Sequence, residues 1–384
     1  SRDRESMDPA PQQNSVTREG HAEPASVRKS VRPVLLVSPR NLVEQTTFIR
    51  HLLVGLTDES IPAAMICPPG FDVESDAPSP AAVFTHPLID LPLMNHIGIA
   101  DLASQLEKFK PTVLHCLSEE RAGLTRQLAR RLRLPVLLMI DRLGTNLPRL
   151  AISPQWCSRL IVPAEAVGAD VRRTLPRIAD RVRQINVGAF VDPGAICFSD
   201  AGRLPSIVVA HPLDRVSDFE SLLRALGSLK AEGREFAAAI MGSGPAERLL
   251  RGRLAALGLS QAVTIVPILH PWRSVLAAAD IFVQPQPLRA FSVFLLEAMA
   301  VGTAVAACWG GVDDLVIPDQ TAATFESDNE TSIRDTLARL LDDRDTARRL
   351  AATAQEHLRA RHTVSEMIET TLRTYAEVQA QYRR

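Results

Sequence analysis

The sequence has few of the features that mark secreted, membrane-spanning or nucleic-acid-binding proteins. Its five cysteines are scattered, with an odd total and no C-x-x-C pair, so neither a disulfide framework nor a zinc site is expected. The expected location of such a chain is the reducing cytoplasm. No apolar run approaches the roughly 18 residues that span a bilayer. Lysine and arginine total 43 against 44 aspartate and glutamate, a net charge of −1 that gives no concentrated positive charge for a nucleic-acid partner.

The N-terminal segment also lacks the apolar centre of a signal peptide. Residues 1–31 alternate charged residues with Pro, Gln and Ser. Such a composition cannot bury enough apolar surface to offset the entropy of ordering. The sequence therefore predicts a disordered tail over 1–31.

The remaining chain is too long for one typical core and shows two successive α/β patterns. Short β-branched runs alternate with helical patterns, which indicates parallel βαβ units. In the first half the strand-like runs are 34–37, 82–84, 112–115, 136–140 and 160–162; in the second half they are 206–210, 236–241, 263–266, 281–283 and 304–307. Pro, Gly and Asp cluster between 192 and 205, so domains are predicted at 32–198 and 199–365, with a binding cleft between them.

A glycine turn follows the strand that ends at Met241. The tetrapeptide 242–245 contains Gly242 and Gly244 and precedes a helical pattern, so a ligand could approach the backbone closely there. An ordinary strand-to-helix turn remains the alternative. It is no dinucleotide fingerprint, because the third glycine of G-x-G-x-x-G would fall on Glu247.

A proline-rich loop and a helix follow the run 281–283. The helix is expected to open near Ser292 and to close at Gly302, so the free N–H groups at Ser292, Val293 and Phe294 could hold a diphosphate. Glu297 lies among apolar residues, where a carboxylate needs a hydrogen-bonding partner such as a ribose diol. The alternative is a solvent-facing glutamate on an amphipathic helix. A further glycine turn, Gly310 and Gly311, follows the next strand.

Together these segments resemble the retaining GT-B glycosyltransferases of family 4, the glycosyl transferases group 1. The resemblance covers 206 to about 375 and rests on a G-x-G-P turn (242–245), an A-D-x-F-V-x-P segment (279–285), the end of an E-G-F-G-x-x-x-L-E-A-M-A motif (289–300) and a G-G-x-x-E element (310–314). It implies an α/β protein with two Rossmann-like parallel-sheet domains facing a central cleft. The N-terminal domain would take the acceptor, the C-terminal domain would bind the nucleotide-sugar donor, and a C-terminal helix, 366–384, would pack back toward the N-domain. It further implies that Glu297 holds the ribose, that Gly242, Gly244, Gly310 and Gly311 line the nucleotide pocket, and that transfer retains configuration without a bound metal or permanently bound cofactor.

Several positions depart from the family pattern. Arg289 stands where the first of two paired glutamates is expected, which inverts the charge; as a candidate catalytic residue it could hold an anionic donor group or the diphosphate. Pro212 and Ser217 replace two cations that neutralise the diphosphate, and Arg215 lies two residues from the second. In the first domain, His115 fits the first histidine of the family's H-x-H motif and is the other candidate catalytic residue, a hydrogen-bonded histidine beneath the cleft being the alternative.

These observations predict an enzyme that transfers a sugar from a nucleotide diphosphate sugar to a glycan or other small acceptor. A catalytically inactive binding or scaffold protein of the same fold is the alternative, motivated by positions 212, 217 and 289, and a GT-B epimerase is a weaker third. The arginines at 121, 126, 130, 131 and 133 make one helix strongly basic. We interpret them as a solvated face, with peripheral attachment to the inner membrane as the other interpretation.

Overall fold

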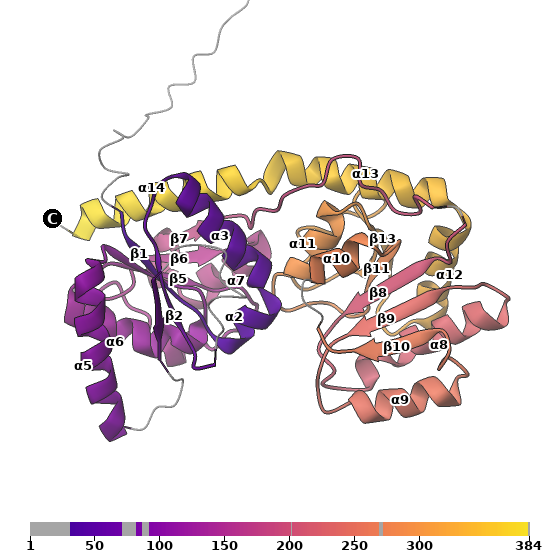
Figure 1. The fold of residues 1–384 in the computed structure, drawn as a ribbon, viewed down its shortest axis with the longest axis horizontal. Coiled ribbons are helices and arrows are strands. Elements are labelled where there is room, and N and C mark those ends of the chain that lie inside the picture. The colour runs from indigo at the N-terminus through magenta and orange to yellow at the C-terminus, as the bar shows by residue number, and fades with distance from the viewer. Residues whose placement is uncertain (1–30, 71–81, 87–91, 201, 269–271, 383–384) are drawn as a thin grey trace, which may run out of the picture.

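The computed structural model describes residues 31–70, 82–86, 92–200, 202–268 and 272–382. The tail predicted over 1–31 lies outside these residues except for Val31, which is fully buried. The described chain forms two parallel α/β lobes (Figure 1). The prediction of two Rossmann-like parallel-sheet domains is therefore confirmed.

The first sheet has seven parallel strands. They are β1 (Pro33–Leu36), β2 (Ala64–Cys67), β3 (Ala82–Thr85), β4 (Val113–Cys116), β5 (Val136–Met139), β6 (Arg159–Val162) and β7 (Val182–Gln184). Their order is β3-β2-β1-β4-β5-β6-β7. The chain direction across the sheet reverses between β1 and β4, and ligands of such sheets bind outside the carboxyl ends of the strands at this switch point.

The second sheet repeats this arrangement with six parallel strands. They are β8 (Ser206–Ala210), β9 (Ala237–Met241), β10 (Val263–Val266), β11 (Ile281–Gln284), β12 (Ala304–Cys308) and β13 (Ala323–Phe325). Their order is β10-β9-β8-β11-β12-β13, so the switch point lies between β8 and β11. The segments that follow these two strands begin at His211 and Pro285.

Helices cover both sheets. They are α2 (Pro39–Glu44), α3 (Thr46–Asp58), α5 (Pro92–Phe109), α6 (Ala122–Leu132), α7 (Glu165–Thr174), α8 (Ser217–Ala231), α9 (Glu247–Ala256), α10 (Trp272–Ala277), α11 (Val293–Ala300), α12 (Glu330–Asp342), α13 (Arg344–Arg361) and α14 (Val364–Tyr382). In Figure 1, α13 and α14 run along one side of the molecule and connect the two lobes. Helix α14 packs against α3 of the first lobe.

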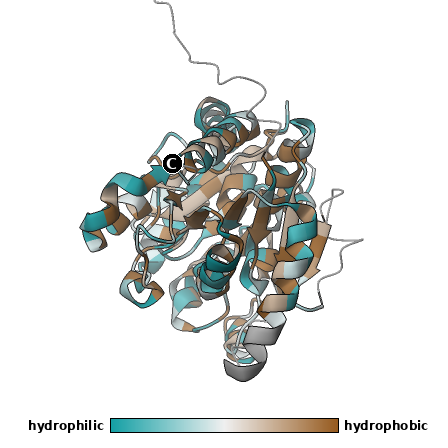
Figure 2. Cartoon of the chain, turned by 90° about the vertical axis from the view of Figure 1, so that its left-hand side faces the viewer, coloured by the Kyte–Doolittle hydropathy of each residue, from teal (hydrophilic) through white to brown (hydrophobic). Residues whose placement is uncertain are grey.

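The core consists of two hydrophobic clusters, of which the larger one joins the lobes. The larger one continues from the first sheet to the α10–α11 face of the second sheet and includes Trp272 and Tyr375. The other lies between the opposite face of the second sheet and helices α8, α9, α12 and α13. Strands in the interior are mostly apolar, and the outer faces of the helices are more hydrophilic (Figure 2). Burial of this kind of surface contributes about 25 cal/mol per Å² and is the main favourable term in folding.

The basic helix differs from its interpretation as a wholly solvated face. Arg121 is 1% exposed, and its guanidinium donates to the carbonyls of Val37, at 2.9 Å, and of His86, at 3.1 Å. Buried arginine needs such acceptors, so this cation ties the end of β1 to the segment after β3. Arg130, Arg131 and Arg133 are exposed. None of the helices in the described residues combines the length and the apolar character of a membrane span.

Candidate functional site

A cavity of about 880 Å³ lies between the two lobes, at the carboxyl ends of both sheets. The first lobe contributes Arg40, Val43, Glu44, Gln45 and Arg142. The second lobe contributes residues that follow β8, β9, β10 and β11. The cavity therefore lies at the switch point of each sheet, where an open α/β sheet binds ligands. Its volume is that of a typical small-molecule site.

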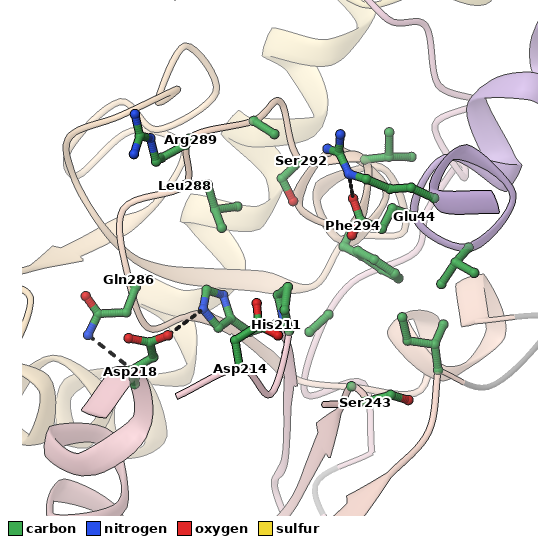
Figure 3. A pocket seen from close by; sticks show the side chains of 18 of the residues that line it. Glu44, His211, Asp214, Asp218, Ser243, Gln286, Leu288, Arg289, Ser292 and Phe294 are labelled. Atoms are coloured by element: carbon green, nitrogen blue, oxygen red, sulfur yellow. Dashed lines mark hydrogen bonds and ion pairs between the residues drawn. The ribbon is translucent and has the colours of Figure 1, made fainter. Parts of the chain in front are cut away.

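Helix α11 begins at the wall of this cavity. Ser292 is its N-cap residue, and the Ser292 hydroxyl accepts a hydrogen bond from the N–H of Leu295 at 3.1 Å. The first N–H groups of a helix have no partner within it, and they carry the positive end of the helix dipole. Ser292, Val293 and Phe294 all line the cavity, as Figure 3 shows for Ser292 and Phe294. The start of α11 is therefore placed to hold an anion.

The glycine turn after β9 allows two loops to approach closely. A Cβ atom on Gly242 would lie 2.3 Å from the carbonyl oxygen of His211, and one on Gly244 would lie 2.3 Å from that of Leu213. Only glycine fits both positions without movement of the backbone. Gly242 lines the cavity, whereas Gly244 packs behind it against the loop that follows β8.

The loop after β8 carries charges of both signs into the cavity. Asp218 lies 4.0 Å from Nε2 of His211 (Figure 3). It also lies 2.9 Å from the Arg215 guanidinium. Arg215, one of the predicted binding residues, lines the cavity, but its side chain is 75% exposed. Asp214 also lines this wall. Burial lowers the pKa of the His211 imidazole, and the two carboxylates oppose that shift. Sequence reasoning did not single out His211 or Asp218.

Arg289 lines the cavity with its loop but turns its guanidinium toward the first lobe. In Figure 3 the side chain points away from His211 and Ser243. A Cβ on Gly144 of the first lobe would lie 2.4 Å from Nη2 of Arg289, so the guanidinium rests on that glycine. The backbone of Arg289 also contacts the first lobe, because the N–H of Leu143 donates to the carbonyl of Arg289 at 2.7 Å. Arg289 is thus part of the junction between the lobes.

Main-chain bonds extend this junction along the cavity. Ala290 pairs with Arg142 in an antiparallel bridge, and the N–H of Phe291 donates to the carbonyl of Asp141 at 2.9 Å. These bonds join the loop after β11 to the segment after β5. Gly310 and Gly311, predicted to line the pocket, support that loop from outside. Both have positive φ, and Gly311 pairs with Leu288 in a parallel bridge.

Glu297 lies within the protein behind this helix start. It is fully buried, and its carboxylate contacts the Arg273 guanidinium, with Nδ1 of His51 at 3.8 Å. Arg273 also donates to Asp192 at 2.8 Å and to the carbonyl of Phe190, both on the segment that links the lobes. Glu297 is not among the residues that line the cavity. A ribose contact would require Arg273 to move away.

His115 is likewise not brought to the cavity. It lies at the end of β4, 3% exposed, and its Nδ1 is 2.7 Å from the hydroxyl of Tyr375 on α14. Burial lowers the pKa of His115 to about 3, so the ring is neutral at ordinary pH. The contact with Tyr375, 260 residues away in sequence, could not be read from the local pattern.

The first lobe adds an ionic network that sequence reasoning missed. Arg40 lies 2.7 Å from Glu44 and 3.3 Å from the buried Asp141, and Arg142 lies 3.5 Å from Glu119. Burial raises the pKa of the Glu44 carboxyl, and Arg40 opposes that shift. These side chains belong to the short helix α2, to the segment after β5 and, for Glu119, to the segment after β4. They give the first lobe's wall polar groups that could bind a hydroxylated acceptor.

Among the described residues, no group of three or more His, Cys, Asp or Glu side chains is arranged to hold a metal ion.

Two parallel-sheet lobes facing a cleft at their switch points define the GT-B architecture, and comparison with solved structures confirms it. A glycosyltransferase from Rickettsia africae has a TM-score of 0.75 at 14% identity, over 91% of this chain and 98% of that one. Sucrose-phosphate synthase from Thermosynechococcus elongatus has a TM-score of 0.73 at 18% identity, over 91% and 100%. Anabaena HepE, solved with UDP and glucose, has a TM-score of 0.74 at 16% identity, over 90% and 100%.

The sequence itself matches a known family over its second lobe. Residues 201–357 match the sequence model of the glycosyl transferases group 1 family. No curated protein matches the chain.

Proposed function

We propose that the protein transfers a sugar from a nucleoside diphosphate sugar to the hydroxyl of an acceptor. In this proposal residues 199–365 bind the donor and residues 32–198 face the acceptor. The C-terminal helix, predicted at 366–384 and described as α14 up to Tyr382, packs back toward the first lobe. The observation that carries it is the start of α11 at the wall of the 880 Å³ cavity, at the switch point between β8 and β11. The match of residues 201–357 to the glycosyl transferases group 1 family supports it.

The chemistry requires charge stabilisation at the departing diphosphate. The bond between the sugar C1 and the diphosphate oxygen breaks, C1 bonds to the acceptor oxygen, and the acceptor proton is released. Negative charge then develops on the diphosphate, and the N–H groups of Val293 and Phe294 at the start of α11 would stabilise it. Retention of configuration and independence of a bound metal are proposed from the family resemblance. The residues of α2 and Arg142 lie across the cavity, on the side proposed for the acceptor.

A binding protein without turnover is the second candidate. Two observations favour it. Asp214 and Asp218 stand on the wall where the family has cations, and the Arg289 guanidinium turns toward Gly144. Carboxylates beside a departing diphosphate would raise the barrier to transfer.

Binding of nucleotide sugars tests the proposal first. Thermal unfolding is followed with UDP-glucose, GDP-mannose and ADP-glucose, and a ligand present at 100 times its Kd stabilises the fold by about 2.7 kcal/mol. At least one of the three is expected to stabilise the protein. No stabilisation by any of them at millimolar concentration would contradict the proposal.

A pair of variants places the binding at α11. Ser292→Ala removes the N-cap of α11, and Asn329→Ala removes the equivalent cap of α12, where the Asn329 side chain accepts from the N–H of Ser332. Each change costs about 1 kcal/mol of stability. Only Ser292→Ala is expected to weaken nucleotide-sugar binding. Equal loss in both variants would mean that the anion is held elsewhere.

Turnover separates the two candidates. Release of nucleoside diphosphate from the bound donor is measured for the natural protein and for Arg289→Glu. Release by the natural protein supports transfer. Binding without release in either protein supports the binding role.

A further inference from the structure

Trp309 differs from the other two tryptophans of the chain in its exposure. Trp156 and Trp272 are 7% and 1% exposed and belong to the larger hydrophobic cluster, whereas Trp309 is 60% exposed. Trp309 is the first residue after β12, so it lies at the carboxyl end of the second sheet, the end at which the cavity is formed. The second lobe therefore presents an indole to solvent on its ligand-binding side.

The turn that carries Trp309 packs against the cavity wall. Gly310 and Gly311 follow it, both with positive φ, and a Cβ on Gly311 would lie 2.2 Å from the carbonyl oxygen of Leu288. The nearest atoms to a Cβ on Gly310 are those of Pro287, at 3.9 and 4.0 Å. Pro287 and Leu288 both line the cavity, as Figure 3 shows for Leu288. Trp309 is therefore held beside the rim of the cavity.

We call Trp309, Gly310, Gly311 and Pro287 the tryptophan strip. All four residues are exposed, and the two glycines add no side chains to the strip. Because Pro287 also lines the cavity, the strip is continuous with it. Such a surface suits the face of a sugar ring. The C–H groups on one face of a pyranose are weakly positive and can rest on the negative face of an indole, while the hydroxyls stay at the edge of the ring.

The polar groups beside the tryptophan strip suit a neutral, hydroxylated ligand. The Asp313 carboxylate accepts from the N–H of Gly310 at 2.9 Å, and the Asp328 carboxylate accepts from Gln286 at 2.8 Å. Arg289 is the cation of the neighbouring loop, and its guanidinium turns toward the first lobe. Carboxylate and amide oxygens accept hydrogen bonds from hydroxyls, whereas an anionic lipid surface attracts clustered cations. A glycan therefore fits this surface better than a membrane does.

The order of the strands indicates which part of the substrates reaches the tryptophan strip. In the proposed function the nucleotide lies at the ends of β8 and β9, and the diphosphate lies at the start of α11. Strand β12 is on the other side of β11 from β8 and β9. The strip is therefore separated from the nucleoside, and a group that reaches it belongs to the acceptor end of the substrates.

We propose that Trp309 stacks against a sugar ring of the acceptor, and that the acceptor is a glycan of two or more pyranose units. One unit lies in the cavity and presents the reacting hydroxyl, and another lies on the tryptophan strip. This inference rests on the proposed function and specifies its acceptor. Trp309 orients the acceptor and takes no part in bond breaking, so its loss weakens acceptor binding and leaves donor binding unchanged.

Tryptophan fluorescence reports on this contact, because Trp309 is the exposed one of the three indoles. The probes are maltotetraose, cellotetraose and chitotetraose, with glucose and N-acetylglucosamine as single-ring controls, each in the presence and absence of UDP. At least one tetrasaccharide is expected to shift the emission to shorter wavelength and to reduce quenching by acrylamide, because a stacked ring displaces water from the indole. The single sugars should bind more weakly, because one ring cannot occupy both positions.

Three variants assign the contact to its residue. Trp309→Ala is expected to weaken binding of the tetrasaccharide, measured by isothermal titration calorimetry, by about threefold to tenfold, the range of an aromatic contact. Trp309→Phe keeps a smaller aromatic face and should lose less. Leu249→Ala is the matched control, because Leu249 is 65% exposed on α9 and does not line the cavity. All three variants should retain the natural urea midpoint and the natural affinity for nucleotide sugars, because the changed side chains are exposed.

The inference and the proposed function fail separately. If no tetrasaccharide binds at millimolar concentration, or if one binds equally well to Trp309→Ala, the inference is overturned. A shift to shorter wavelength with vesicles of phosphatidylcholine and phosphatidylglycerol, and with none of the glycans, would also overturn it and would identify a lipid surface instead. In each of these cases binding of UDP-glucose, GDP-mannose or ADP-glucose leaves the proposed function standing. Failure of all three nucleotide sugars to bind contradicts the proposed function, whatever the glycans do.

Discussion

Removal of Arg273 should be among the most destabilising single changes in the second lobe. Glu297 is fully buried, and Arg273 is the cation in direct contact with its carboxylate. Arg273→Met leaves that carboxylate in a low-dielectric interior with only the His51 imidazole nearby. That ring is neutral at pH 7, because burial lowers the pKa of His51 to about 4. Breaking a buried pair in this way costs about 3–5 kcal/mol.

The matching change on the acid should cost less. Glu297→Gln leaves Arg273 with Asp192 at 2.8 Å and with a side chain that is 25% exposed to water, so a loss of about 1–3 kcal/mol is expected. In the double variant no buried charge is left uncompensated. Its stability should be close to that of Glu297→Gln alone, so the coupling energy should equal the cost of Arg273→Met, about 3–5 kcal/mol.

Urea unfolding of the natural protein, the two single variants and the double variant measures this coupling. Arg224→Met provides the control, because Arg224 pairs with Glu220 on the surface of α8 at 2.9 Å, and exposed pairs contribute little. A cost of at most about 0.5 kcal/mol is expected there. If Arg273→Met were as mild as Arg224→Met, or if the two single changes were additive, Glu297 would not depend on Arg273 and this reasoning would be wrong.

Three further changes test other parts of the structure. Gly311→Ala should lower stability by about 1–3 kcal/mol and weaken donor binding. The reason is that Gly311 has φ of 80° and that an added Cβ would lie 2.2 Å from the carbonyl oxygen of Leu288. Unchanged unfolding and unchanged affinity would contradict this. Burial lowers the pKa of His115 to about 3, so the unfolded state binds the proton first and stability should fall as pH drops from about 6.5 toward 3. In urea unfolding from pH 7.5 to 5, His115→Phe should reduce the dependence of stability on pH by up to about 1.4 kcal/mol per pH unit. An equal dependence in both proteins would refute this. Asp314→Ala should lower the free energy of unfolding by about 1 kcal/mol, because the Asp314 carboxylate accepts from the N–H of Glu165 at 2.7 Å and caps α7 from the other lobe. An unaltered urea midpoint would show that this cap contributes nothing.

The local patterns in the sequence predicted five of the six strands of the second lobe and missed β13. The apolar runs at 206–210 and 281–283 became β8 and β11, and the interval from Ser292 to Gly302 became α11 with Ser292 as its N-cap. Short-range chemistry decides such features, because capping and β-propensity depend on neighbouring residues. The cavity residues on α11 could be predicted for the same reason.

The first lobe shows where local reading was incomplete. Sequence reasoning did not identify the short helix α2, which Ser38 caps and whose side chains Arg40 and Glu44 line the cavity. A signal was present, because a serine followed by proline at the first helical position is typical of a helix start. The helix is only six residues long, too short to show a periodic apolar pattern.

The partners of the buried polar residues could not be predicted at all. Glu297 was assigned a ribose because an isolated carboxylate among apolar residues needs a partner, and the structure supplies Arg273 from α10 instead. His115 finds Tyr375 on the last helix. These pairs join elements that only the tertiary fold brings together, so residue type and spacing gave the need for a partner and not its identity.

The most direct test of the account is a crystal structure of the protein with a bound nucleoside diphosphate or nucleotide sugar. The diphosphate should lie against the N–H groups of Val293 and Phe294, with the nucleoside beside Gly242. A diphosphate located elsewhere, or an unliganded cavity at a saturating nucleotide concentration, would contradict the central claim that the start of α11 forms the anion site of this cleft.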